Sequence, residues 1–77
     1  MVLYTKRYGA LRSELQAVRL AKPLTQTELA HALGKTQSYV SKIETGEQYV
    51  DVIEFLAWCE VTGADACHIL QHVKAAG

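Results

Sequence analysis

Apolar residues recur at helical spacing along most of this chain, and proline or glycine interrupts the pattern at intervals. In the first segment Leu11, Leu15 and Val18 fall on one helix face. Pro23 ends that segment, because its ring disfavours helical backbone at the preceding residue. No segment has the alternation of a convincing strand, so the chain is expected to be all-α. Spacing and capping residues predict helices over roughly residues 6–21, 26–33, 37–45, 52–62 and 66–74.

The strongest capping signals surround the second and third predicted helices. Thr25 and Glu28 form a capping box, in which the hydroxyl accepts from the Glu28 amide and the carboxylate reaches back. Gly34 supplies the left-handed residue that ends the helix, and Thr36 caps the next one. Two short helices joined by so tight a turn push the start of the second outward as a ridge. The pattern predicts a helix-turn-helix with its core at about residues 25–45.

Polar side chains occupy the outward face of the predicted 37–45 helix. An amide carries a donor and an acceptor that match the N6/N7 edge of adenine, so we expect Gln37 to contribute most to base recognition. The expected base contacts come from Gln37, Ser38, Ser41 and Lys42. The expected contacts to the DNA backbone come from Gln26, Lys35, Thr36, Tyr39 and Gln48.

Charge is distributed unevenly along the chain, although eight Lys and Arg balance eight Asp and Glu. Residues 1–42 carry seven basic and two acidic side chains, whereas residues 43–77 carry one basic and six acidic. A dipolar molecule can offer a basic face to phosphate even when its net charge is zero. Ordinary solvated surface charge would give the same totals, but here the basic half also holds the helix-turn-helix pattern.

The predicted 52–62 helix is more apolar than one buried face requires. Its main stripe of Val52, Phe55, Leu56 and Cys59 is expected to face the core. The remaining apolar residues would stay exposed on so short a chain unless something covered them, and a second subunit is the expected cover. This predicts a dimer interface that includes Ile53, Trp58, Val61, Ile69 and Val73.

Other classes of function find little support in the residues. Cys59 and Cys67 fit no zinc spacing and are expected to be reduced core residues. His68 and His72 share a helix face, but no third ligand is evident, so neither metal nor cofactor is expected. The sequence shows no nucleophile–base pair and no phosphate-binding glycine loop, which argues against an enzyme. Without a long apolar run or a signal-peptide centre, the chain is expected to be cytoplasmic and free of membrane segments.

Residues 24–46 closely resemble the phage repressor and Cro-like family of helix-turn-helix proteins, also called XRE-type. The matching pattern is Leu-Thr-Gln-x-x-Leu-Ala, x-x-Leu-Gly, then x-x-Gln-Ser-x-Val-Ser-x-Ile-Glu-x-Gly. The resemblance extends more loosely over residues 8–74. It implies one compact five-helix, lambda-repressor-like domain over residues 1–77, and sequence-specific binding of double-stranded DNA, usually as a dimer on a palindromic operator.

By position, the resemblance also implies that Gln26 holds a phosphate, that Gln37, Ser38 and Lys42 face bases, and that Glu44 is structural. The chain departs from the family after its Glu-x-Gly, where Gln48, Tyr49 and Val50 replace the frequent basic residue and proline.

The expected function is that of a small dimeric transcriptional regulator, a repressor rather than an enzyme, with no room for a separate effector pocket. The alternative is a DNA-binding antitoxin or other interaction module that binds a protein partner through the 52–62 and 66–74 helices. The short stretch after Val73 favours the plain regulator, because a toxin-neutralising protein usually carries an extra arm.

Overall fold

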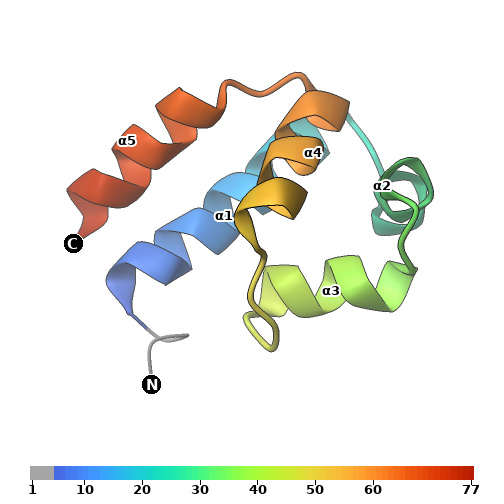
Figure 1. Ribbon diagram of the computed structural model, residues 1–77, viewed down its shortest axis with the longest axis horizontal. Coiled ribbons are helices and arrows are strands. Elements are labelled where there is room, and N and C mark those ends of the chain that lie inside the picture. The colour runs from blue at the N-terminus through green and yellow to red at the C-terminus, as the bar shows by residue number, and fades with distance from the viewer. Residues whose placement is uncertain (1–4) are drawn as a thin grey trace.

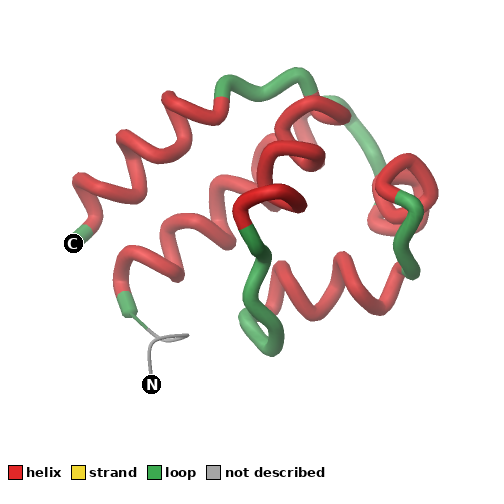
Figure 2. The backbone as a smooth tube through the Cα atoms, viewed as in Figure 1, coloured by secondary structure: helices red, strands yellow, loops and turns green. Residues whose placement is uncertain are grey.

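Residues 5–77 are described by the computed structural model, and they form five helices joined by short loops (Figure 1). This part of the chain contains no strand (Figure 2). The all-α prediction is confirmed, and the only boundary that moves is the end of the last helix, two residues later than predicted. The helices are α1 Lys6–Ala21, α2 Gln26–Leu33, α3 Gln37–Thr45, α4 Val52–Thr62 and α5 Ala66–Ala76.

Each helix begins at a residue whose side-chain oxygen accepts a backbone amide of the first turn, which satisfies donors that have no partner inside the helix. The predicted capping box is present. The Glu28 amide donates to the Thr25 hydroxyl at 3.0 Å, and the Thr25 amide donates to the Glu28 carboxylate at 2.9 Å. The hydrogen bond from the Thr25 amide to the carboxylate is the main cause that lowers the pKa of Glu28. The helix boundaries therefore follow from local chemistry that is visible in the sequence.

The core lies between the helices: α3, α4 and α5 pack on α1, and α2 packs on α3 and α4 (Figure 1). Trp58 of α4 is completely buried, and its indole N–H donates to the carbonyl of Leu15 at 3.1 Å. A buried indole needs such a partner, because an unpaired N–H would cost the free energy of its desolvation. The buried apolar residues are Leu15, Leu29, Ala30, Val40, Ile43, Phe55, Trp58, Cys59 and Ile69.

The buried face of α4 differs from the predicted stripe. Phe55, Trp58, Cys59 and Thr62 face inward, whereas Val52 and Leu56 are exposed. Both stripes have the same i, i+3, i+4, i+7 spacing, so apolar periodicity alone does not choose between them. Burying the large indole removes the most apolar surface from water, and that favours the observed rotation of the helix.

The predicted dimer interface is corrected by the same rotation. Trp58 and Ile69 are 0% and 1% exposed, so they belong to the core of one chain and present no surface to another. Val61 and Val73 are partly buried against that core. Ile53 is exposed as expected. Of the two cysteines only Cys59 is buried, so the core assignment of Cys67 is wrong.

No helix within residues 5–77 combines the length and the apolar character needed to span a bilayer.

Candidate nucleic-acid interface

The start of α3 projects into solvent, because the opposite side of the helix is anchored in the core. Val40 and Ile43 are fully buried. Ser41 is half-buried on the flank of the helix. The exposed residues of α3 are Gln37, Ser38, Lys42 and, at its last position, Thr45. The residues predicted to contact bases therefore lie together on one accessible side of a short helix.

The turn between α2 and α3 is tight because its backbone is left-handed at Gly34, where φ is 68°. The Gly34 amide donates to the carbonyl of His31 at 3.1 Å, and the next amide, of Lys35, donates to the carbonyl of Ala30 at 2.9 Å. A residue with a Cβ adopts this conformation only with strain, which explains why glycine stands here. The turn fixes the angle at which α3 leaves α2.

A continuous chain of hydrogen bonds runs from the core to the tip of α3. Arg19 of α1 donates to the Glu44 carboxylate from Nε at 2.6 Å and from Nη2 at 3.0 Å. Glu44 Oε1 also accepts from Gln26 Nε2 at 3.0 Å. Gln26 Oε1 in turn accepts from Gln37 Nε2 at 2.7 Å. Glu44 is thus structural, as the family resemblance implies, and it joins α1, α2 and α3.

Lys35 does not stand free beside the predicted DNA surface. Its ammonium lies 2.8 Å from the carboxylate of Glu54 on α4 and 5.2 Å above the centre of the Tyr39 ring. The hydrogen bond to Lys35 is the main cause that lowers the pKa of Glu54, and the same bond raises the pKa of Lys35. A contact of Lys35 with phosphate therefore has to compete with Glu54.

The expected backbone contact of Tyr39 is not available in this conformation. Its hydroxyl oxygen is buried and has no hydrogen-bond partner among residues 5–77. Burial is the main cause that raises the pKa of this phenol. The Thr36 hydroxyl caps α3 by accepting from the Tyr39 amide at 3.1 Å, while the side chains of Thr36 and Gln48 remain exposed.

Two residues of α1 that the sequence did not single out hold the end of α3 and the loop that follows it. The Tyr8 hydroxyl donates to the carbonyl of Gln48 at 3.2 Å and accepts from the amide of Val50 at 3.1 Å. Arg12 donates to the carbonyl of Glu44 at 3.2 Å and lies against Gly46, where a Cβ would meet its guanidinium. These partners are more than thirty residues apart in sequence, so no local pattern marks them.

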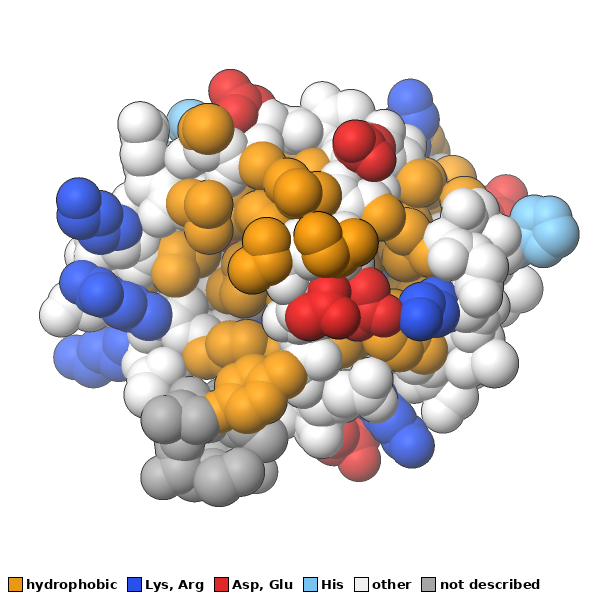
Figure 3. All heavy atoms as spheres, in the orientation of Figure 1, with side chains coloured by type: hydrophobic (Ala, Val, Ile, Leu, Met, Phe, Trp, Pro, Cys, Tyr) orange, Lys and Arg blue, Asp and Glu red, His pale blue; other side chains and the backbone are white. Residues whose placement is uncertain are grey.

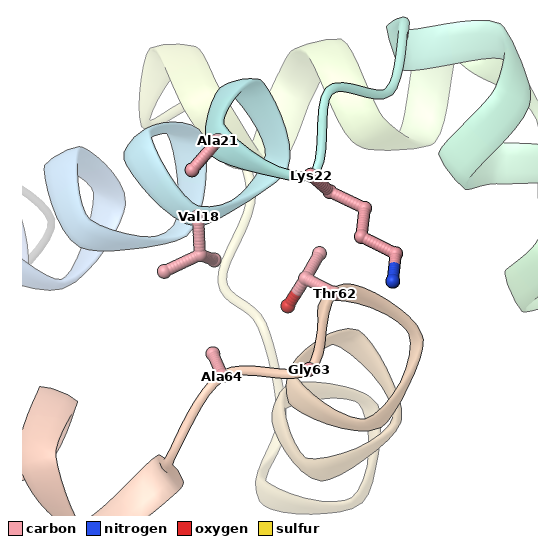
Figure 4. Close-up of a pocket in the computed structure, with 6 residues that line it drawn as sticks. All are labelled: Val18, Ala21, Lys22, Thr62, Gly63 and Ala64. Atoms are coloured by element: carbon pink, nitrogen blue, oxygen red, sulfur yellow. The ribbon is translucent and has the colours of Figure 1, made fainter.

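The remaining features lie away from α3. The rings of His68 and His72 are 4.4 Å apart, and His72 lies 3.3 Å from Glu14. No cluster of three or more potential ligands suited to a metal ion was found among residues 5–77. A shallow hollow of about 310 Å³ separates the end of α1 from the end of α4 (Figure 4). It is lined by Val18, Ala21, Lys22, Thr62, Gly63 and Ala64.

Comparisons with known proteins agree with this geometry. The sequence profile of the helix-turn-helix family matches residues 15–67. An XRE-family like protein from Pseudomonas syringae pv. tomato is 45% identical and superposes with a TM-score of 0.82, over 90% of this chain and 84% of that one. The clp gene regulator ClgR from Corynebacterium glutamicum is 28% identical with a TM-score of 0.80, over 92% and 91% of the two chains. A search of curated proteins gave no match.

Proposed function

The chain belongs to the XRE-type helix-turn-helix family of DNA-binding transcriptional regulators, and we propose that it is a dimeric repressor that binds a palindromic operator through α3. In this proposal Gln37, Ser38, Ser41 and Lys42 contact base edges. Contacts to the sugar–phosphate backbone come from Gln26, Thr36 and Gln48, with Lys35 when it leaves Glu54. The protein would act in the cytoplasm, without a cofactor and without catalysis.

One observation carries the proposal: a short helix presents its polar face outward while its apolar face is fully buried. The fold holds Gln37 and Ser38 exposed at the leading end of α3, where the Gln37 amide donates to Gln26 of α2. The major groove admits a helix of this kind, and amide and hydroxyl side chains can distinguish base edges there. The helix-turn-helix family match and the regulator among the structural neighbours favour the same role.

The test is a titration of the protein against its own upstream DNA and against random duplex, at several salt concentrations. A specific binder shows a steep salt dependence and a clear preference for its operator. Gln37→Ala is expected to lower the preference by about 1–3 kcal/mol, because the base edge then loses its amide partner.

Lys42→Ala is compared with Gln37→Ala in the same titration. The Lys42 ammonium can reach a phosphate as well as guanine, so its contacts are not limited to base edges. If Gln37→Ala leaves the sequence preference unchanged, α3 does not recognise bases in the way proposed. If the unchanged protein shows no preference at all, the proposed sequence-specific function fails.

The apolar outer face of α4 favours a second candidate function, that of a DNA-binding antitoxin that binds a protein partner. Val52 and Ile53 are 72% and 73% exposed, and Leu56 is 42% exposed. Such a face fits a second copy of the chain, as in the dimeric repressor, or the partner of a DNA-binding antitoxin. Analytical ultracentrifugation of the pure protein decides between them, since only self-association gives a dimer without another chain.

A further inference from the structure

The outer face of α4 holds three neighbouring apolar side chains, Val52, Ile53 and Leu56, which we call the α4 patch. The other side of the helix is fixed in the core by Trp58, whose indole donates to the carbonyl of Leu15. A rotation of α4 that covered the patch would expose the largest side chain of the core. Another molecule, in contrast, can cover the patch and remove its apolar area from water without disturbing the core.

The charges that border the α4 patch along the chain are all negative. Residues 47–65, which comprise α4 and the loops at its two ends, carry five acidic side chains and no basic one. Asp51 is exposed at the N-cap, and Glu60 is exposed on the same face as Ile53, two turns further on. Figure 3 shows acidic side chains above and below the hydrophobic group over α4.

Two of these carboxylates are available to a partner. Among residues 5–77, Glu54 pairs with Lys35 at 2.8 Å, whereas Asp51 and Glu60 form no ion pair. Asp51 and Glu60 stand at opposite ends of the patch, about 13 Å apart along the helix axis at 1.5 Å per residue. A partner that brings a cation to each end would add two charge pairs at the border of an apolar contact.

A second copy of the chain fits the α4 patch less well than a basic partner does. In a twofold interface the same surface occurs on both sides, so the acidic border of one copy would face the acidic border of the other. Contacts between like charges oppose association. The same border disfavours nucleic acid and anionic lipid, because both are negatively charged. A protein segment with basic side chains has the complementary charge.

We propose that the α4 patch is the docking site for a basic amphipathic helix of another protein. The apolar stripe of that helix covers Val52, Ile53 and Leu56, and its Lys or Arg side chains lie near Asp51 and Glu60. The inference rests on the second candidate function proposed above, in which the chain binds a protein partner. It does not depend on DNA binding by α3.

The probes are designed helical peptides that differ in charge. The first two have the same leucine stripe, flanked by Lys in one peptide and by Glu in the other. A third has the composition of the Lys peptide in an order that breaks the stripe. Isothermal titration calorimetry with the full chain should show the Lys peptide binding about tenfold or more tightly than either of the others. This advantage should shrink at high salt, because salt screens exposed charges.

Variants of the chain test the two parts of the docking site separately. Ile53→Ser should weaken binding of the Lys peptide about tenfold, because apolar contact is lost. Leu20→Ser is its control, since Leu20 is exposed on α1. Asp51→Asn with Glu60→Gln removes both charges and keeps an N-cap oxygen, so most of the advantage over the Glu peptide should disappear. Glu28→Gln removes a charge on α2, preserves the capping box and should leave that advantage unchanged.

Circular dichroism verifies that each variant is folded, and Val52→Ser replaces Ile53→Ser if the latter is not. A Lys peptide that binds the Ile53→Ser variant as tightly as the unchanged protein would overturn the inference. Equal binding of the Lys and Glu peptides would refute a basic partner and leave an apolar docking face. If neither peptide binds, the inference and the second candidate function fail together.

Sedimentation of the protein without peptide provides the remaining test. A dimer that Ile53→Ser converts to monomer would show that a second copy occupies the α4 patch. That result would overturn the inference and leave the dimeric regulator standing.

Discussion

Helices α3 and α4 follow one another in the chain, and each is capped at its start and ended by a left-handed glycine, but their outer faces have opposite character. α3 turns Val40 and Ile43 inward and leaves polar side chains outside. α4 turns Phe55 and Trp58 inward, and yet its outer face is apolar. Figure 3 shows hydrophobic side chains gathered over α4 at the centre of the molecule.

The difference between the two helices separates two kinds of surface. The polar side chains on the outer face of α3 are hydrated in the free protein. They can exchange hydrogen bonds with water for hydrogen bonds with base edges, and no apolar surface becomes exposed. The outer face of α4 keeps apolar side chains in water, and it gains free energy when another surface covers them. One helix is therefore suited to polar recognition and the other to association.

The largest expected effect comes from the inward side of α4. Trp58→Ala should lower the free energy of unfolding by about 3–5 kcal/mol, because it empties a fully buried site and leaves the Leu15 carbonyl without its indole partner. Urea denaturation followed by circular dichroism measures the change. Ile53→Ala on the exposed side of the same helix should stay within about 0.5 kcal/mol, at a protein concentration where the chain is monomeric. Equal losses in both variants would contradict the observed rotation of α4.

The same contrast explains what the sequence could predict. The bounds of α3 and the buried side of that helix followed from Thr36, Gly46 and a stripe whose opposite face is polar. For α4 the bounds also follow from the caps, but two stripes have the same spacing and the core buries the one that periodicity does not predict. Periodicity identifies the buried side of a helix only when the other side is polar.

The outward positions of α3 were predicted from local spacing, whereas the contacts that hold them were not. Arg19 pairs with Glu44 across 25 residues of sequence, and nothing near either residue indicates the partner. The pairing of Lys35 with Glu54 likewise joins a turn to a helix that packs there only in the folded chain. Such contacts depend on how the helices pack, which no window of the sequence contains.

The effect expected for each chain is smaller at the outer face of α4, and it concerns association instead of folding. If two copies meet through this face, Ile53→Ser removes about 1.5–3 kcal/mol of apolar burial from each protomer of a twofold dimer. Sedimentation equilibrium should show a weaker dimer with an unchanged helical fold by circular dichroism. Leu20→Ser is the control, since Leu20 is also exposed but lies on α1.

A monomeric unchanged protein at tens of micromolar would rule out α4 as a self-interface. A dimer that responds to Leu20→Ser and ignores Ile53→Ser would place the interface elsewhere.

The smallest effect is expected where the two helices meet, at the Lys35–Glu54 pair. Glu54→Gln removes the carboxylate that holds the Lys35 ammonium and frees it for a phosphate. Binding to operator and to random duplex should then strengthen alike, and the dependence of log K on log salt should steepen by about 0.9, the value for one more phosphate contact. Glu60→Gln makes the same change of charge at an exposed position of α4 and should leave the slope nearly unchanged.

Adding Lys35→Ala to Glu54→Gln should cancel the gain, because the released cation is then absent. A gain that survives in this double variant, or an equal gain from Glu60→Gln, would show that general charge and not the lysine is responsible.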